Sequence, residues 1–191
     1  DGCFINLFVS HKKIEDILKD SRVVGVALTG SEAAGSSVAQ LAGKYLKKST
    51  MELGGADAFV VLKDADMDKT VKWAVFGRHW NAGQVCVSSK RMIIDAAVYD
   101  EFLTKYTKGV GELVAGDPMD PKTTLAPLSS QTAADDVRKQ IAEAVAHGAT
   151  ATEVGPKVPD RGAFVQPTIL TNVTPDNPAY YQEFFGPVSM I

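Results

Sequence analysis

The chain has 191 residues, with 20 Lys and Arg against 23 Asp and Glu, and 45% of its side chains are apolar. This is the composition of an ordinary globular protein. The formal charge of −3 comes without a basic run, which argues against a nucleic-acid partner, because such proteins bind phosphates through clustered Lys and Arg. No stretch approaches the roughly 18 to 20 consecutive apolar residues of a membrane span. We therefore expect neither nucleic acid nor membrane as a partner.

The number and spacing of the cysteines indicate whether the protein resides in a reducing or an oxidising cellular compartment. Cys3 and Cys86 have neither the number for a disulfide framework nor the spacing of a C-x-x-C metal site, so we expect a reducing, cytoplasmic location. The three histidines form no ligand pattern, which predicts that there is no metal site. Because the chain begins at Asp1 and stops at Ile191 within an apolar run, we expect an internal piece of a longer protein.

The first 50 residues predict a short helix and one strand–turn–helix unit. Apolar residues recur at helical spacing between Ser10, a plausible N-cap, and Asp20. The β-branched run at residues 23–28 predicts a buried strand. After the Thr-Gly-Ser turn, Ser31 or Glu32 opens a second helix that ends in a cluster of lysines.

The remaining chain alternates strands with helices of ten or more residues and contains neither an internal repeat nor a low-complexity linker. This alternation predicts an α/β architecture with a largely parallel sheet. We expect strands at 49–53, 58–62, 91–95 and 165–170, helices from Asp66 or Asp68 to before Asn81, at 99–113 and at 132–147, and turns at 116–121 and 183–187.

Cys86 is the first candidate for chemistry, since it follows the polar turn at residues 81–84 (NAGQ). Taken alone, a cysteine is most often a small buried hydrophobe. If the loop runs into the first turn of a new helix, the helix amides favour a thiolate there. A thiolate is a nucleophile, and its own amide is placed to meet an oxyanion. A hydrolase pairing of Cys86 with His147 is an alternative.

Glu52 ends a predicted strand beside Gly54 and Gly55, where a carboxylate is either a solvated edge residue or a buried general base. A strand, a helix and a turn separate it from Cys86, which allows both side chains to meet at the carboxyl ends of the strands. The turn at residues 30–35 (GSEAAG) lacks the G-x-G-x-x-G pattern, so it is either a plain tight turn or an anion site at a helix N-terminus.

Four segments together resemble the NAD(P)-dependent aldehyde dehydrogenase superfamily. They correspond to its nucleotide-side turn, glutamate motif, cysteine motif and E-x-F-G-P motif, in the family's order, and the resemblance covers essentially the whole chain. Residues 77–86 and 88–91 (SSKR) are most similar to bacterial succinate-semialdehyde dehydrogenases. The four segments are residues 28–31 (LTGS), 51–55 (MELGG), 81–86 (NAGQVC) and 183–187 (EFFGP).

The resemblance implies an α/β, parallel-sheet aldehyde dehydrogenase-like fold. Residues 1–55 would be the end of the Rossmann-like NAD(P)-binding domain, and residues 56–191 most of the catalytic domain. The family's upstream Asn, a second oxyanion donor, is not in this sequence. Because losing one such donor costs about 10²- to 10³-fold in rate, we expect the 191-residue chain alone to be inactive. The full-length protein is expected to be a homo-oligomer, a dimer or tetramer.

The resemblance also implies roles for single residues. Cys86 would attack a small aldehyde, and the similarity to succinate-semialdehyde dehydrogenases implies that this aldehyde is succinate semialdehyde. After hydride transfer, Glu52 would activate water against the resulting thioester. The cofactor would be NAD or NADP, with Ser31 near its pyrophosphate, Glu183 on the nicotinamide ribose and Phe185 near the nicotinamide. The implied cofactor-binding residues are Gly30, Ser31, Leu53, Glu183 and Phe185.

Two other readings remain open at this point. In a CoA-acylating aldehyde dehydrogenase, CoA takes the acyl group in place of water, and Glu52 argues against it because a thiol acceptor has little use for a water-activating base. Methylmalonate-semialdehyde chemistry is disfavoured for the same reason. A non-catalytic relic or assembly module would keep the fold without the activity, which the presence of both Cys86 and Glu52 opposes.

Overall fold

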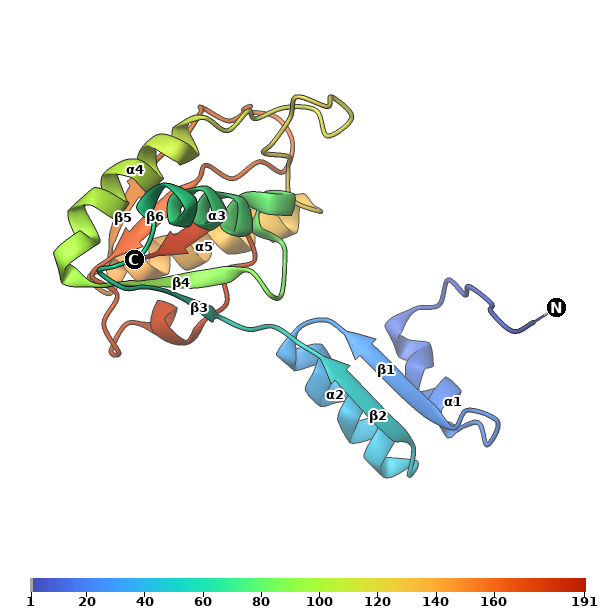
Figure 1. The fold of residues 1–191 in the computed structure, drawn as a ribbon. Helices are drawn as coiled ribbons and strands as arrows, with labels where there is room; N and C mark the ends of the chain where they lie inside the picture. The colour runs from blue at the N-terminus through green and yellow to red at the C-terminus, as the bar shows by residue number, and fades with distance from the viewer. Residues whose placement is uncertain (1) are drawn as a thin grey trace. The chain divides into compact units, whose positions relative to one another are not determined.

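The computed structural model describes residues 2–191, and the chain divides after Gly54 into two compact units. The N-terminal unit, up to Gly54, has two short helical segments, one longer helix and two strands (Figure 1). They are η1 (His11–Lys13), α1 (Ile14–Lys19), β1 (Gly25–Thr29), α2 (Glu32–Lys44) and β2 (Lys48–Glu52).

The N-terminal unit is a β–α–β motif. β1 and β2 pair in parallel, and their last pair is Thr29 with Glu52. Of the two residues expected to open this helix, Ser31 is the N-cap of α2 and Glu32 its first residue, and the Ser31 hydroxyl accepts a hydrogen bond from the Ala34 N–H at 3.3 Å. Inside α2, Gly35 leaves room for Leu53, since a Cβ at Gly35 would lie 2.5 Å from a Leu53 methyl carbon.

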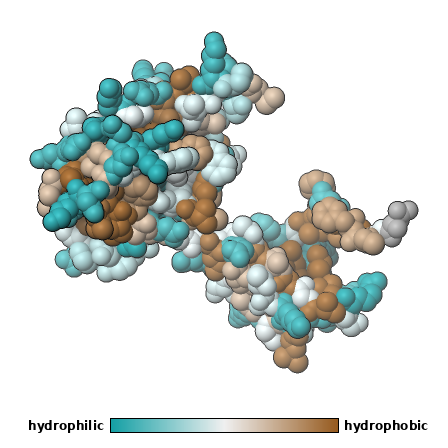
Figure 2. Space-filling model, in the orientation of Figure 1, coloured by the Kyte–Doolittle hydropathy of each residue, from teal (hydrophilic) through white to brown (hydrophobic). Residues whose placement is uncertain are grey.

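The prediction of a fully buried strand at residues 23–28 is wrong. β1 starts at Gly25 and alternates between exposed and half-buried residues, and Val24 is 80% exposed. The physical reason is that β1 belongs to a sheet of two strands in which Val26 and Leu28 share the covered face, while the residues between them face away. Figure 2 shows apolar residues in brown on the surface of the N-terminal unit.

The C-terminal unit, residues 55–191, is built on a five-stranded sheet of order β3-β4-β7-β6-β5. Neighbouring strands run parallel except β5, which pairs antiparallel with β6, so the predicted largely parallel sheet is confirmed. The elements are β3 (Asp57–Val61), α3 (Met67–His79), η2 (Trp80–Gly83), β4 (Ser89–Ile94), η3 (Ala96–Val98), α4 (Tyr99–Gly111), α5 (Gln131–Ala146), β5 (Thr150–Glu153), β6 (Thr168–Thr171), η4 (Pro178–Tyr181) and β7 (Val188–Met190).

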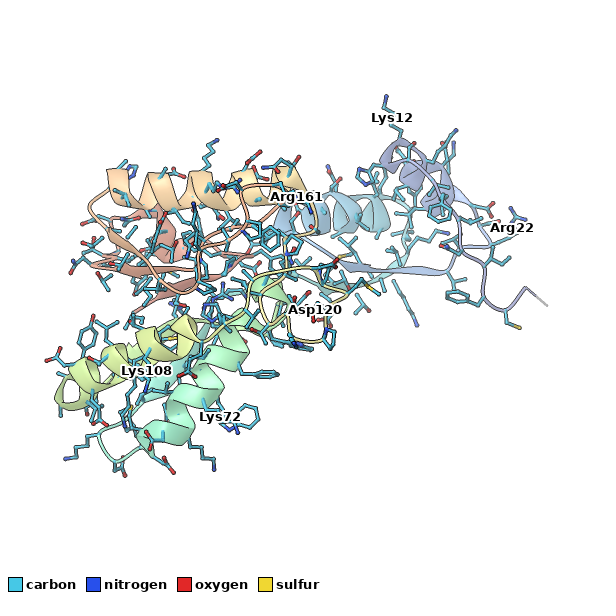
Figure 3. The ribbon with its side chains drawn as sticks, turned by 90° about the horizontal axis from the view of Figure 1, so that it is seen from above. Lys12, Arg22, Lys72, Lys108, Asp120 and Arg161 are labelled. Carbon is cyan, nitrogen blue, oxygen red and sulfur yellow. The ribbon has the colours of Figure 1, made fainter. Side chains whose placement is uncertain are left out.

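This sheet is covered on both faces, with α5 on one side and α3 and α4 on the other (Figure 3). Successive strand residues point to opposite faces, and β6 follows this rule. Ile169 packs into the cluster formed with α3 and α4, whereas Leu170 packs into the cluster formed with α5. Two separate apolar cores therefore hold the middle strands, β6 and β7, in place.

The predicted helices of the C-terminal unit agree with α3, α4 and α5 to within about two residues at each end. Of the two candidate caps, Asp66 and Asp68, it is Asp66 that caps α3. Its side chain accepts a hydrogen bond from the Lys69 N–H at 3.1 Å. β5 and the three-residue β7 were not predicted, because a polar strand and a very short one carry little periodicity. Within residues 2–191, no helix combines the length and the apolar character needed to cross a membrane.

Candidate active site

The sheet topology brings two of the four motifs to one edge. The loop with Cys86 leads into β4, and the loop with Glu183 leads into β7. β4 and β7 are neighbours and parallel, so the loops before them meet at the amino ends of the two strands. The expectation that Cys86 lies at the carboxyl ends of the strands is therefore wrong. The loop that carries Cys86 precedes β4, which places it at the amino end of that strand.

The cysteine loop is a tightly wound turn. Asn81, Ala82 and Gly83 have φ values of 51°, 54° and 77°, in the left-handed region. Gln84 holds the turn closed, because its Nε2 donates to the Asn81 carbonyl at 3.0 Å and its Oε1 accepts from the Ser129 N–H at 2.8 Å.

Cys86 is exposed and lies in a further turn that passes directly into β4. No helix begins at this position, so the expected helix N-terminus beside the thiol is wrong. The short distance to β4 explains why: Ser89 already pairs with the neighbouring strand, three residues after Cys86, which leaves no room for a helical turn.

Arg78, the residue before the end of α3, is fully buried and joins the two loops. Its guanidinium donates to the Ser88 hydroxyl at 2.8 Å in the cysteine segment and to the Phe184 carbonyl at 2.8 Å in the Glu183 segment. It also donates to the carbonyls of Gly83, Gly186 and Val188. Burial lowers the pKa of Arg78 to about 10, which keeps it charged at neutral pH.

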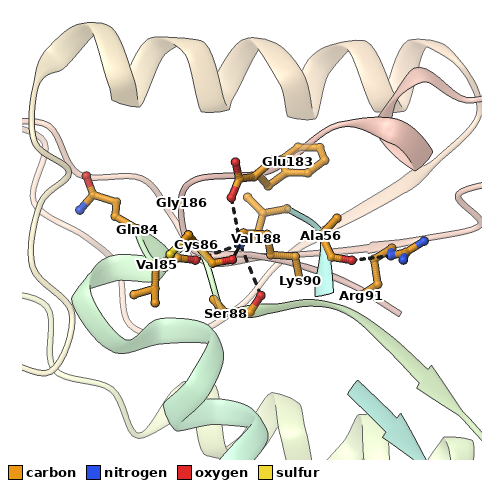
Figure 4. A network of polar contacts seen from close by, with 12 residues as sticks. Ala56, Gln84, Val85, Cys86, Ser88, Lys90, Arg91, Glu183, Gly186 and Val188 are labelled. Carbon is orange, nitrogen blue, oxygen red and sulfur yellow. Dashed lines mark hydrogen bonds and ion pairs between the residues drawn. The ribbon is translucent and has the colours of Figure 1, made fainter. Parts of the chain in front are cut away.

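Lys90, in β4, makes the second connection between the loops (Figure 4). Its side chain is 0% exposed, and its Nζ lies 2.8 Å from the Cys86 carbonyl, 2.9 Å from the Val85 carbonyl and 3.0 Å from Oε1 of Glu183. A buried ammonium is tolerated only with a charge partner, and Glu183 is that partner. Lys90 thus links the backbone of Cys86 to the side chain of Glu183 at the amino ends of β4 and β7.

The Glu183 segment alternates between the core and the surface. Phe184 is fully buried in the cluster under α5, whereas Phe185 is 44% exposed. Gln140 of α5 donates to the Glu183 carbonyl at 3.0 Å, so the backbone is held from both faces of the sheet. The Glu183 side chain remains 24% exposed, although its Oε1 is buried. A carboxylate anchored on one oxygen and partly open is suited to accept hydrogen bonds from hydroxyl groups of a ligand.

The other predicted site residues lie in the N-terminal unit. Glu52 is exposed at the end of β2, and its carbonyl accepts from the Gly30 N–H at 3.0 Å. The Ser31 hydroxyl is occupied as the cap of α2, and Leu53 packs against Gly35. The first-turn amides of α2 at Glu32 and Ala33 have no intrahelical acceptor. Those free N–H groups fit an anionic group such as a pyrophosphate.

A groove runs beside the cysteine loop. Its walls include the exposed rings of Phe76 and Trp80, which stack at 6.0 Å between centroids, and its lining reaches Asn81 and Ala82 of the loop. Thr123 and Thr124 face them from the loop after α4. The groove can therefore admit a small molecule next to the segment that carries Cys86.

The histidines do not take part in this arrangement. His79 is buried at the end of α3, and burial lowers its pKa to about 4. His147 is exposed at the end of α5 and bonds through Nδ1 to the Glu143 carbonyl of its own helix, which speaks against its use as a partner for Cys86. In the part of the chain that the structure describes, no group of three or more His, Cys, Asp or Glu side chains is arranged to hold a metal ion.

Sequence reasoning missed the roles of Arg78 and Lys90. A signal existed for Arg78, since it shares one face of α3 with Val71 and Ala74 at positions i, i+3 and i+7. A charged residue in an apolar stripe indicates a buried charge. For Lys90, the strand alternation with buried Met92 gives the same indication.

Comparison with known proteins agrees with the geometry. Residues 4–191 match the family model described as "Aldehyde dehydrogenase family". The succinate-semialdehyde dehydrogenase [NADP(+)] of Deinococcus radiodurans is 48% identical over 190 residues, which are 100% of this chain and 40% of that protein. The corresponding protein of Mycobacterium avium is 43% identical and is matched over 40% of its length by 99% of this chain. This chain thus spans about two fifths of the length of these relatives.

Solved structures share the fold. The succinic semialdehyde dehydrogenase of Streptococcus pyogenes in complex with NADP+ is 53% identical with a TM-score of 0.93, and the match covers 97% of this chain and 41% of that one. Lactaldehyde dehydrogenase of Escherichia coli is 30% identical with a TM-score of 0.85, over 92% of this chain and 37% of that one. The expected aldehyde dehydrogenase-like fold is confirmed, and the chain belongs to the aldehyde dehydrogenase family.

Proposed function

We propose that these residues are the cysteine-bearing part of an enzyme that oxidises succinate semialdehyde to succinate with NADP or NAD. The observation that carries the proposal is the joining of the Cys86 loop to Glu183 through Lys90 and Arg78 at one edge of the sheet. Family membership supports aldehyde oxidation, and the names of the most similar relatives favour succinate semialdehyde and NADP.

In the proposed reaction, the Cys86 thiolate attacks the aldehyde carbon and forms a thiohemiacetal whose oxygen carries the developing negative charge. Cys86 is exposed, so a substrate can reach its sulfur, and the groove lined by Phe76 and Trp80 leads to its loop. The backbone amide of Cys86 is the donor in this chain that meets the oxyanion. Loss of hydride from the former aldehyde carbon then leaves a thioester on Cys86.

The residues present fit a dinucleotide cofactor. Glu183 offers a partly exposed carboxylate to the ribose hydroxyls, and Phe185 offers an exposed ring face. The free first-turn amides of α2, beside Gly30 and Ser31, suit the pyrophosphate. When bound, the oxidised nicotinamide accepts the hydride from the substrate carbon.

Glu52 is proposed to take a proton from the water that attacks the thioester, which releases the carboxylic acid and restores the thiol of Cys86. Glu52 is exposed, and it precedes Ala56 by only four residues in the chain. Within the C-terminal unit, Arg91 of β4 donates from Nε to the Ala56 carbonyl at 2.8 Å. This contact holds Ala56, the residue before β3, next to β4, the strand that follows Cys86.

The test is the rate of NADPH or NADH formation with succinate semialdehyde, butyraldehyde and acetaldehyde, with each cofactor, with and without CoA. It is made on the 191-residue chain and on the full-length enzyme, meaning a natural chain that carries these residues at the length of its relatives. We expect the full-length enzyme to prefer succinate semialdehyde, with no need for CoA. The short chain is expected to be inactive.

Two results would contradict the proposal. A strict requirement for CoA would assign the acyl transfer to a thiol and would leave Glu52 without a role. No reduction of either cofactor by the full-length enzyme with any of the aldehydes would favour a non-catalytic protein of the same fold. We further propose a cytoplasmic homo-oligomer, which size-exclusion chromatography with light scattering and cell fractionation would test.

A further inference from the structure

The ammonium group of Lys90 holds both peptide groups that flank Cys86. Its Nζ donates to the carbonyl of Val85, in the peptide before Cys86, at 2.9 Å, and to the carbonyl of Cys86, in the peptide after it, at 2.8 Å. The ammonium also forms an ion pair with Oε1 of Glu183, at an N–O distance of 3.0 Å. It also donates to the Ser88 carbonyl at 3.4 Å, so its three N–H donors serve three carbonyls of this turn, and the Glu183 carboxylate balances its charge.

These contacts determine where the Cys86 amide points. A trans peptide is planar, with its C=O and N–H directed to opposite sides, and the described residues contain no cis peptide bond. Because the Val85 carbonyl points to Lys90, the Cys86 N–H of the same peptide points away from Lys90. Among residues 2–191, no group accepts a hydrogen bond from this N–H. It is therefore available as an oxyanion donor.

The second peptide is the one that needs a fixed orientation. Residues 85–88 form a β-turn closed by a hydrogen bond from the Ser88 N–H to the Val85 carbonyl at 3.1 Å. In such a turn the central peptide, here between Cys86 and Val87, can take two opposite orientations that distinguish turn types I and II. The Cys86 carbonyl belongs to this peptide, and its bond to Lys90 selects one orientation.

We propose that Lys90 is a positioning residue that fixes the two peptides around Cys86, so that the Cys86 amide meets the oxyanion, and couples them to the carboxylate of Glu183. This rests on the proposed function, in which Cys86 is the nucleophile and Glu183 holds the cofactor ribose. Lys90 touches neither substrate nor cofactor and acts through the backbone of the turn.

The test compares Lys90→Met with Glu183→Gln, with the double variant and with Lys108→Met in the full-length enzyme. Lys108 is an exposed lysine of α4 (Figure 3), so its replacement controls for the loss of a positive charge. Removal of one partner of a buried ion pair destabilises a protein, whereas removal of both often does not. The double variant therefore keeps the test possible if Lys90→Met fails to fold.

The first readout is the burst of reduced cofactor at saturating cofactor, counted per folded active site. We expect Lys90→Met to slow the burst about 10²-fold, the usual cost of one oxyanion donor, and to raise the KM for the cofactor. Glu183→Gln should raise this KM while the burst rate stays within about tenfold, because Lys90 still holds the turn. The double variant should show the slow burst of Lys90→Met, and Lys108→Met should resemble the parent.

The second readout is alkylation of Cys86 by iodoacetamide at the high-pH plateau, where the thiol is fully ionised. This reaction needs no oxyanion donor, so we expect rates within about threefold of the parent in all variants. Equal losses in alkylation and in the burst would mean that Lys90 only keeps the loop folded, and would overturn the proposal. An unchanged burst in Lys90→Met, or in the double variant where the single one does not fold, would also overturn it.

A crystal structure of Lys90→Met, or of the double variant, decides the matter independently of activity. We expect the peptide between Cys86 and Val87 to be rotated or present in two orientations. A single, unchanged orientation of both peptides contradicts the role of Lys90. If the parent enzyme reduces neither cofactor with any aldehyde, the proposed function fails, while this structural comparison still tests the positioning role.

Discussion

The carbonyl of Gly186 lies where a side chain of Gly83 would begin. A Cβ built on Gly83 would overlap the Gly186 carbonyl, and it would also lie 3.1 Å from Nη1 of Arg78. The cysteine loop and the Glu183 loop therefore touch through bare backbone at this point. This contact explains why residue 83 is a glycine, whereas a Cβ on Gly186 would approach a different neighbour, Cγ2 of Val137, at 3.0 Å.

Replacement of Gly83 by Ala is expected to destabilise the C-terminal unit strongly, by about 3 kcal/mol or more. A residue with a side chain pays roughly 1 to 2 kcal/mol for the left-handed backbone, and Gly83 has φ of +77°. The overlap with backbone atoms of Gly186 adds a term of typically 1 to 3 kcal/mol, because neither chain can move without breaking the Arg78 bonds. Urea unfolding of the parent and of Gly83→Ala measures the difference in their free energies of unfolding.

Gly77 provides the matched control for this substitution. It lies inside α3, and a Cβ at this position would meet nothing within 4 Å. Gly77→Ala is therefore expected to stabilise by roughly 0.5 to 1 kcal/mol, since alanine favours the helix. A similar loss in both variants would show that the contact between Gly83 and Gly186 is not the cause.

The sequence allowed the order and type of most elements to be predicted, because amphipathic spacing and capping residues are local signals. Asp66 was a candidate cap and Ser31 one of two residues expected to open a helix, and both cap their helices through a side-chain oxygen, whereas the candidate cap Ser10 makes no such hydrogen bond. The surroundings of Cys86 were not predictable in this way. Whether a helix or a strand follows a turn depends on pairing with β3 and β7, which are remote in sequence.

The candidate site was predicted only in part for a related reason. Motif residues identify themselves by type, so Cys86 and Glu183 were found. The cations that join them have no motif of their own, and their role follows from burial beside backbone carbonyls. The apolar stripe of α3 and the alternation of β4 indicate that Arg78 and Lys90 are buried, but which carbonyls they bind depends on the meeting of two loops remote in sequence.

His79 is expected to make stability depend on pH between about 4 and 6.5. Its pKa is lowered to about 4, mainly by burial; the hydrogen bond to the Val75 carbonyl acts in the opposite direction, and the charge of the neighbouring Arg78 contributes to the lowering. The unfolded chain binds a proton near pH 6.5, while the folded chain does not until about pH 4. Stability is thus complete above pH 6.5 and falls as the pH is lowered through this window, by a total on the order of 3 kcal/mol.

Urea unfolding at several pH values tests this. His79→Leu should flatten the stability profile between pH 4 and 6.5, because it removes the group that the unfolded state protonates. His147→Gln is the control, since His147 is exposed, and it should keep the slope of the parent. An equal slope in the parent and in His79→Leu would assign the pH dependence to other groups.

Cys86 is expected to be the essential thiol of the full-length enzyme. Both cysteines are free and exposed, so exposure alone does not distinguish them. Cys86→Ser should abolish cofactor reduction, by about 10⁴-fold or more, whereas Cys3→Ser should leave it within twofold. We also expect iodoacetamide to alkylate Cys86 faster than Cys3 at neutral pH, measured by peptide mass spectrometry. Equally slow alkylation of the two thiols would contradict the assignment of Cys86 as the nucleophile.

Glu52 is expected to act after hydride transfer and not before it. Glu52→Gln keeps the size of the side chain but cannot accept the proton of the attacking water, so the thioester on Cys86 should accumulate. A stopped-flow measurement should then show a burst of reduced cofactor close to one per active site, followed by turnover about 10²- to 10⁴-fold slower than in the parent. Glu153 is the matched control, because it is also an exposed glutamate that ends a strand, and Glu153→Gln should retain full turnover. If the burst disappears together with turnover in Glu52→Gln, Glu52 acts in the attack of Cys86 or in cofactor binding, and water activation must come from another group.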